Sequence, residues 1–160
     1  MAGKIKLFIF LFSSLLIFSC NDGNTLVNEY RKNPEKTWNW GKKNSFTFEI
    51  TDLTVYYDLY FNLRIDGGYN YSNLYILASI SGPEKTFEKQ RFQWPLTADD
   101  GRWTGEGLGD IISYKLPLKM SAVFKTKGKY TIEFEQNMRD ENLAGIMETG
   151  LEVKKGRKIF

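Results

Sequence analysis

The amino-acid sequence predicts an all-β protein: a single antiparallel β-sandwich, with a jelly-roll connection as one option, behind a short export signal. Beyond residue 37, apolar and polar residues alternate with a period of two along most of the chain. Turn sequences that contain glycine or proline separate these runs. No stretch beyond the signal has a sustained helical period. Seven or eight short strands with turns between them are typical of a sandwich.

The first nineteen residues have the pattern of a lipoprotein signal peptide. Lys4 and Lys6 precede the apolar run 7–18, which as a helix would reach roughly 18 Å, too short for a bilayer core of about 30 Å. The sequence Leu-Ile-Phe-Ser-Cys at 16–20 resembles a bacterial lipobox. We therefore expect residues 1–19 to be removed and Cys20 to be the lipid attachment site. An ordinary cleaved signal that leaves a free thiol is the alternative.

The mature chain is expected to have two parts. Residues 20–37 are polar and are expected to form the lipidated N-terminus and a tether, whose later part Leu26, Val27 and Tyr30 would anchor. Residues 38–160 are expected to form the sandwich, since the alternation begins there.

The alternation places the individual strands. The expected strands are residues 46–50, 59–65, 74–80, 86–94, 120–124, 130–135 and 150–154. The nearly continuous apolar run at 74–80 predicts a central strand that is covered on both faces. The sequence Thr-Lys-Gly-Lys at 126–129 predicts a hairpin turn between its neighbours.

Composition excludes several classes of protein. Cys20 is the only cysteine, so no disulfide can form within the chain. The absence of histidine excludes a Ser-His-Asp or Cys-His catalytic arrangement and the usual zinc sites. Removal of residues 1–19 lowers the formal charge from +3 to +1, because two lysines are lost. We expect no nucleic-acid binding and no cofactor. Composition leaves open enzymes built only on carboxylates and sites that hold Ca²⁺.

The longest irregular stretch, residues 97–110, is the candidate partner-binding site. Glycines that permit unusual backbone conformations alternate there with charged residues and a tryptophan. The candidate residues are Asp99, Asp100, Gly101, Arg102, Trp103, Gly105, Gly107 and Asp110. An EF-hand loop starting at Asp99 would need oxygen ligands where Gly101 and Trp103 stand, so the calcium pattern fails. A purely structural surface loop is the alternative to a partner-binding loop.

Two further features leave alternatives open. Glu133 and Glu135 are expected to lie on one face of a strand, about 7 Å apart. A glycosidase could use carboxylates at this spacing, but acidic residues are also common on the solvent-exposed face of a sheet. Trp38, Trp40 and Trp103 would either pack against the core or stack on sugars or protein partners. Trp94 is expected to pack in the core or at its edge.

Several short motifs, in this order and spacing, resemble the GldH family of gliding-motility lipoproteins from Bacteroidetes. They are Glu29-Tyr30, Asp-Leu-Tyr-Phe-Asn-Leu-Arg at 58–64, Tyr-Asn-Tyr-Ser-Asn-Leu at 69–74, Ala-Asp-Asp-Gly-Arg-Trp-Thr-Gly-Glu-Gly at 98–107, Glu-Gln-Asn-Met-Arg at 135–139, and Gly145-Ile146. The resemblance implies a non-enzymatic envelope lipoprotein that supports gliding and the associated type IX secretion machinery. It brings no agreed catalytic or ligand residues.

These observations set the expected location and partners. The protein would be held at the membrane by lipid on Cys20 and would contact other gliding or secretion proteins of the envelope, with no small-molecule substrate. Asp22 is the only acid among the four residues after Cys20, which favours a periplasm-facing domain on the outer membrane. The alternative function is a carbohydrate-binding envelope module that uses loop aromatics.

Overall fold

The computed structural model describes residues 23–84 and 89–159, which form strands joined by turns and one short 3₁₀ helix. The strands are β1 (Thr25–Lys32), β2 (Thr37–Asn39), β3 (Asn44–Ile50), β4 (Val55–Asp66), β5 (Asn73–Ser81), β6 (Gln90–Pro95), β7 (Glu106–Leu108), β8 (Ile111–Ala122), β9 (Gly128–Gln136), β10 (Asn142–Ala144) and β11 (Ile146–Lys158). The 3₁₀ helix, η1 (Pro34–Lys36), lies between β1 and β2. The predictions for residues 1–22, which include the signal peptide and Cys20, lie outside the described residues.

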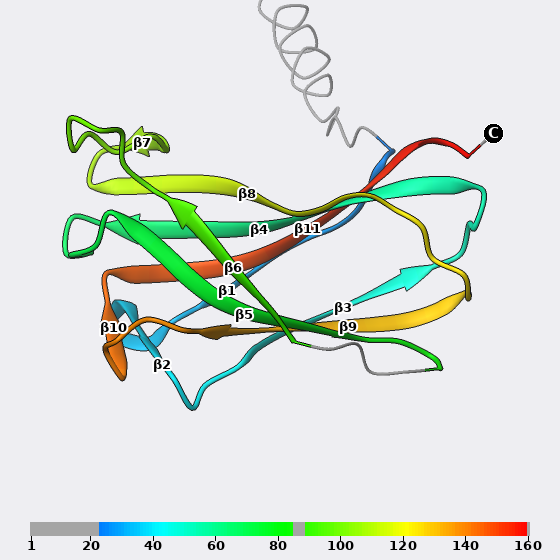
Figure 1. Cartoon of the computed structure of the whole chain (residues 1–160), viewed down its shortest axis with the longest axis horizontal. Coiled ribbons are helices and arrows are strands. Elements are labelled where there is room, and N and C mark those ends of the chain that lie inside the picture. The colour runs from blue at the N-terminus through cyan, green and yellow to red at the C-terminus, as the bar shows by residue number, and fades with distance from the viewer. Residues whose placement is uncertain (1–22, 85–88, 160) are drawn as a thin grey trace, which may run out of the picture.

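The strands form two antiparallel sheets packed face to face (Figure 1). One sheet has the order β1-β11-β4-β8-β7 and the other β3-β9-β5-β6, and a two-stranded ribbon of β10 and β2 lies at one end. Most connections between consecutive strands of the two large sheets pass from one sheet to the other, which gives a jelly roll. The expectation of an all-β antiparallel sandwich is confirmed.

Aromatic rings fill the space between the sheets. Phe61 on β4 is fully buried, and its ring centre lies 4.8 Å from that of Phe134 on β9 in an edge-to-face contact. Near-parallel rings continue outward from Phe61 through Trp94 to Phe92, at centroid separations of 5.8 and 5.4 Å. Trp38 stacks on Phe61 from another direction and is also fully buried. The aromatic-rich core compensates for the absence of disulfides.

Strand β5 differs from the expectation for 74–80. It does lie between β9 and β6, but its side chains alternate between buried and half-buried instead of being covered on both faces. Leu74 and Ile76 face the core, while Tyr75 and Leu77 lie on the outer face. The guanidinium of Arg91 lies 4.3 Å above the Tyr75 ring. In a two-layer sandwich the outer face meets water, and long polar side chains cover its apolar residues there.

Strand β8 also differs from the expectation. It is twelve residues long and ends at Ala122, whereas the sequence placed a strand at 120–124. The predicted hairpin at 126–129 is wrong, because β8 and β9 belong to different sheets and the segment between them crosses the sandwich. Pro117 and a register shift opposite Leu59 interrupt the alternation that would have revealed the strand.

The stretch expected to be a tether contains β1. Its residues pair with β11 from Thr25 opposite Lys154 to Lys32 opposite Glu148. Main-chain hydrogen bonds to a neighbouring strand do not depend on side-chain polarity, so a polar sequence can extend a sheet at its edge. The described residues contain no helix that is long and apolar enough to cross a bilayer.

Candidate functional site

The predicted partner-binding loop lies at the end of the sandwich away from the start of β1 (Figure 1). Thr25, at the start of β1, pairs with Lys154, which pairs with Asp58 near the beginning of β4. Asp66, at the other end of β4, pairs with Ile111 directly after the loop. The eight residues of β1 correspond to roughly 25 Å, so the loop faces away from the point where the described chain begins.

Backbone hydrogen bonds fold the loop back on itself. The carbonyl of the buried Leu96 accepts hydrogen bonds from the Thr104 N–H at 3.0 Å and from the Tyr114 hydroxyl at 2.7 Å. Further out, the Ala98 N–H donates to the Arg102 carbonyl at 2.8 Å. The loop is therefore a fixed projection of the rigid sandwich.

The tip of the loop is exposed and carries both charge signs. Arg102 Nε lies 2.7 Å from Asp100 Oδ2, and this hydrogen bond holds the pKa of the Asp100 carboxyl below its ordinary value. Gly101 has a φ of +83°, which permits the tight turn between them. Asp99 is exposed beside the pair. Such an exposed ion pair adds little stability, so its groups are available to a partner.

Trp103 lies beneath the tip and is half-buried. It forms a β-bridge with Thr97, and its ring centre lies 6.3 Å from that of the buried Tyr69. Burial raises the pKa of Tyr69, whose hydroxyl donates to the Asn73 carbonyl at 2.6 Å. Among the tryptophans left open by the sequence, Trp38 belongs to the core. Trp40 is 46% exposed, and its indole N–H donates to the Met138 carbonyl.

The other predicted residues of the loop have different roles. A side chain at Gly105 would lie 2.6 Å from the Ser113 carbonyl, so this glycine permits close packing of the loop on β8. Gly107 has no such close neighbour. Asp110 adds negative charge near Lys36, although the hydrogen bond to Asp66 is the main cause that raises the pKa of Lys36. The structure thus groups Asp99 to Trp103 into one projecting surface.

Glu133 and Glu135 do lie on one face of β9, but lysines pair with both. Lys43 Nζ lies 3.2 Å from a Glu133 carboxylate oxygen and 3.1 Å from one of Glu135, and Lys89 Nζ lies 2.8 Å from Glu135. Burial raises the pKa of Glu135, but the hydrogen bonds from Lys89 and Lys43 outweigh it and leave that pKa below its ordinary value. A general acid needs the opposite shift.

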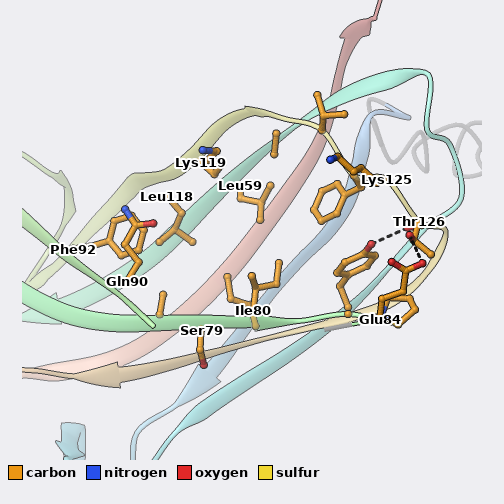
Figure 2. A pocket seen from close by; sticks show the side chains of 18 residues that line it. Leu59, Ser79, Ile80, Glu84, Gln90, Phe92, Leu118, Lys119, Lys125 and Thr126 are labelled. Carbon is orange, nitrogen blue, oxygen red and sulfur yellow. Dashed lines mark hydrogen bonds between the residues drawn. The ribbon is translucent and has the colours of Figure 1, made fainter. Parts of the chain in front are cut away.

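A second feature was not predicted from the sequence: an apolar groove of about 800 Å³ between the two sheets (Figure 2). Figure 2 shows Leu59 and Leu118 from one sheet and Ile80 and Phe92 from the other around the same space. The full lining is Leu59, Ala78, Ser79, Ile80, Gly82, Pro83, Glu84, Gln90, Phe92, Leu118, Lys119, Ala122, Val123, Phe124, Lys125, Thr126, Tyr130 and Ile132. Its volume is in the range of small-molecule sites.

The groove exists because one long side of the sandwich stays open. On the opposite side, edge strands β1 and β3 contact each other and close the core. On the open side, β7 covers only the first three residues of β8, so the rest of that edge faces the space beside β5 and β6. No single strand carries this feature, so its residues give no local signal in the sequence.

A smaller polar hollow of about 510 Å³ lies on the outer face of the sheet that contains β1. Its charges are already matched: Lys115 Nζ lies 2.8 Å from Glu152 Oε1 and 4.3 Å above the Tyr60 ring. The Arg64 guanidinium similarly lies 4.3 Å above Tyr30. These contacts stabilise the sheet surface. The groove is the larger of the two hollows.

Fold and site together define the class: a jelly-roll β-sandwich domain with a projecting end loop and a ligand-sized groove along one open edge. The chain belongs to the GldH lipoprotein family, whose model matches residues 25–153. It is 32% identical to the gliding motility lipoprotein GldH homolog of Christiangramia forsetii, over 97% of this chain and 98% of that protein. It is 29% identical to the gliding motility lipoprotein GldH of Flavobacterium johnsoniae, over 91% and 94%. The resemblance inferred from the motifs is confirmed.

Among solved structures, the chain is similar to a family 28 carbohydrate-binding module specific for non-crystalline cellulose. The TM-score is 0.45 at 10% identity, and the match covers 81% of this chain and 73% of the other. A likeness at this level carries no information on what the chain binds.

Proposed function

We propose that this chain is a lipid-anchored envelope protein that supports gliding motility and the associated type IX secretion machinery by binding other envelope proteins. The observation that carries the proposal is the family match across residues 25–153, together with two relatives that are named as gliding motility lipoproteins. Because the match spans nearly all of the described strands, the whole sandwich takes part in the similarity.

The anchor is the acylated Cys20. Each buried methylene of a lipid contributes about 0.8 kcal/mol to membrane binding, and stable anchoring takes more than one acyl chain. A multiply acylated N-terminal cysteine satisfies that condition. With Asp22 as the only acid among the next four residues, the domain faces the periplasm from the outer membrane.

The surface from Asp99 to Trp103 is the partner-binding site of this proposal. It projects from the end of the sandwich away from the start of β1, so a tethered domain presents it to proteins at a distance from the membrane. Arginine and tryptophan are the residues most enriched at binding hot spots, and Arg102 and Trp103 are adjacent here.

The proposed role needs no catalysis. The chain has no histidine, and Glu133 and Glu135 are neutralised by lysines. In the described residues no group of three or more acidic, cysteine or histidine side chains is arranged to hold a metal ion.

Two measurements test the proposal in a gliding host. Cys20→Ser is expected to abolish partitioning into detergent and to stop colony spreading, while the domain still folds, since every described strand begins at Thr25 or later. Persistent detergent partitioning of Cys20→Ser would contradict the anchor.

The second measurement recovers the wild type from crosslinked envelopes. Recovery of motility or secretion proteins supports the proposal. Retention on envelope glycans without such proteins would favour the carbohydrate-binding alternative instead.

A further inference from the structure

The groove between the sheets combines an apolar interior with a basic rim. Of its aliphatic and aromatic lining, Leu59 and Ala78 are buried, while Ile80, Phe92 and Leu118 remain half-buried and face the hollow. Partly exposed apolar side chains around one space leave apolar surface in contact with water, which an apolar occupant would remove.

One end of the groove is closed by a specific arrangement. The Thr126 hydroxyl donates to Glu84 Oε1 at 2.9 Å, and the Tyr130 hydroxyl donates to the Thr126 carbonyl at 2.8 Å. Phe124 packs edge-on against Tyr130 with ring centres 4.7 Å apart. Gly82 leaves room for the Tyr130 ring, since any side chain there would overlap with it. These contacts give the groove a closed end.

Charge at the rim is mainly positive. Lys119 on β8 and Lys125 after it are exposed and belong to the lining (Figure 2). Among the lining residues that the structure describes, Glu84 is the one acid, and it is already hydrogen-bonded to Thr126. Lys119 and Lys125 each offer an ammonium group at the rim that could form a charge-assisted hydrogen bond with an anionic group.

The free edge of β8 is poorly suited to a strand from another protein. Pro117 has no N–H to donate, and Lys115 and Lys119 flank it. Proline and lysine on an edge strand are the devices by which sheets avoid pairing with other chains. An occupant of the groove is therefore held by apolar contact and charge rather than by strand addition.

The groove also lies near the point where the described chain begins. Thr25 pairs with Lys154 and Lys154 with Asp58, which is next to the groove residue Leu59. Leu59 in turn pairs with Lys119 at the rim. Three strand spacings separate this rim from Thr25, or roughly 15 Å. For a lipid-anchored chain, this places the groove on the membrane-proximal end of the domain.

We propose that this groove binds one acyl chain of an anionic single-chain amphiphile of the fatty-acid class. The chain lies among Leu59, Ile80, Phe92 and Leu118, and its carboxylate meets Lys119 and Lys125. Such a site goes beyond a purely protein-binding role, because it couples the domain to the lipid content of the envelope.

The test uses dodecanoate and 1-dodecanol with the lipid-free mature chain, residues 20–160 carrying Cys20→Ala. All buried core residues lie between Trp38 and Val153, so this form retains the whole core. Isothermal titration calorimetry is expected to show one site for dodecanoate. Absence of measurable binding by a folded protein would overturn the proposal.

Two pairs of variants locate the site. Leu118→Glu is expected to weaken dodecanoate binding at least roughly tenfold, while Met120→Glu, an exposed position on the same strand outside the lining, changes it less than about twofold. Thermal melting of both variants checks the fold. If Leu118→Glu fails to fold, the lysine variants decide the question. An equal loss of dodecanoate binding in folded Leu118→Glu and folded Met120→Glu would overturn the groove as the site.

The charge-reversal pair tests the head group. Lys119→Glu with Lys125→Glu is expected to weaken dodecanoate roughly tenfold and to leave dodecanol within about twofold. The matched control, Lys127→Glu with Lys158→Glu, changes exposed lysines outside the lining and is expected to have no effect. Insensitivity of dodecanoate to the first pair would overturn the anionic head group.

Two other occupants would overturn the proposal in recognisable ways. If the acylated wild type in vesicles fails to bind dodecanoate while the Cys20→Ala form binds it, the protein's own acyl chain fills the groove. Self-association of the wild type that Leu118→Glu abolishes would identify a second copy of the chain as the occupant.

Discussion

Trp103→Ala distinguishes a partner-binding role of the end loop from a structural one. A fully buried tryptophan removes about 150–250 Å² from water, which at about 25 cal/mol per Å² corresponds to about 5 kcal/mol. Trp103 is half-buried against Tyr69, so its truncation is expected to cost about 2 kcal/mol. For a chain of this size that corresponds to about 4–8 °C in melting temperature.

Trp38 and Trp40 provide matched controls. Trp38 is fully buried, its ring stacks on Phe61, and its indole N–H donates to the Lys42 carbonyl at 2.9 Å. Trp38→Ala is therefore expected to cost about 3–5 kcal/mol. Trp40 is 46% exposed and lies outside the loop, so Trp40→Ala should leave partner binding intact.

The assay measures two properties of each variant: thermal unfolding of the lipid-free mature chain, and recovery of partners from crosslinked envelopes. Trp103→Ala is expected to keep a cooperative transition and to lose the partners. A destabilisation as large as that of Trp38→Ala would show that Trp103 is a core residue. Undiminished partner recovery would refute the interface directly.

Three further predictions concern stability. Gly145 has a φ of +81°, and a side chain there would overlap with the backbone of Tyr69. Gly145→Ala should therefore lower the free energy of unfolding in urea by about 1–3 kcal/mol. Gly67→Ala, where a side chain would meet open space, should leave that free energy nearly unchanged. The hydrogen bond from Lys36 holds the pKa of Asp66 below its ordinary value of 3.8. The ionised Asp66 therefore stabilises the folded protein above that pH, and this stabilisation is lost as the pH falls through the folded-state pKa. Asp66→Asn should accordingly reduce the loss of unfolding free energy that is measured between about pH 7 and pH 3. A calcium chelator should leave the melting temperature unchanged; a fall that calcium reverses would contradict the absence of a metal requirement.

The local alternation of the sequence was sufficient for most strands. Phe46, Phe48 and Ile50 occupy buried positions of β3 with exposed residues between them, as period two requires. The same rule placed the middle of β4 and of β9. It missed β1 and most of β8, because an edge strand of mixed polarity and a strand interrupted by Pro117 do not display that period. It also missed the three-residue strands β2, β7 and β10, which are too short to show a period, and β7 lies inside the stretch 97–110 that was expected to be irregular.

The sequence by itself determined the all-β class and the family, because strand periodicity, turn residues and motif order are local properties of the chain. Only the tertiary structure decided which strands pair, that Trp38 is fully buried while Trp103 is half-buried, and that a groove with Lys119 and Lys125 at its rim opens between the sheets. These depend on contacts between residues far apart in sequence: Leu59 and Phe92 meet only because two sheets pack face to face, and the groove is the space those sheets leave unfilled.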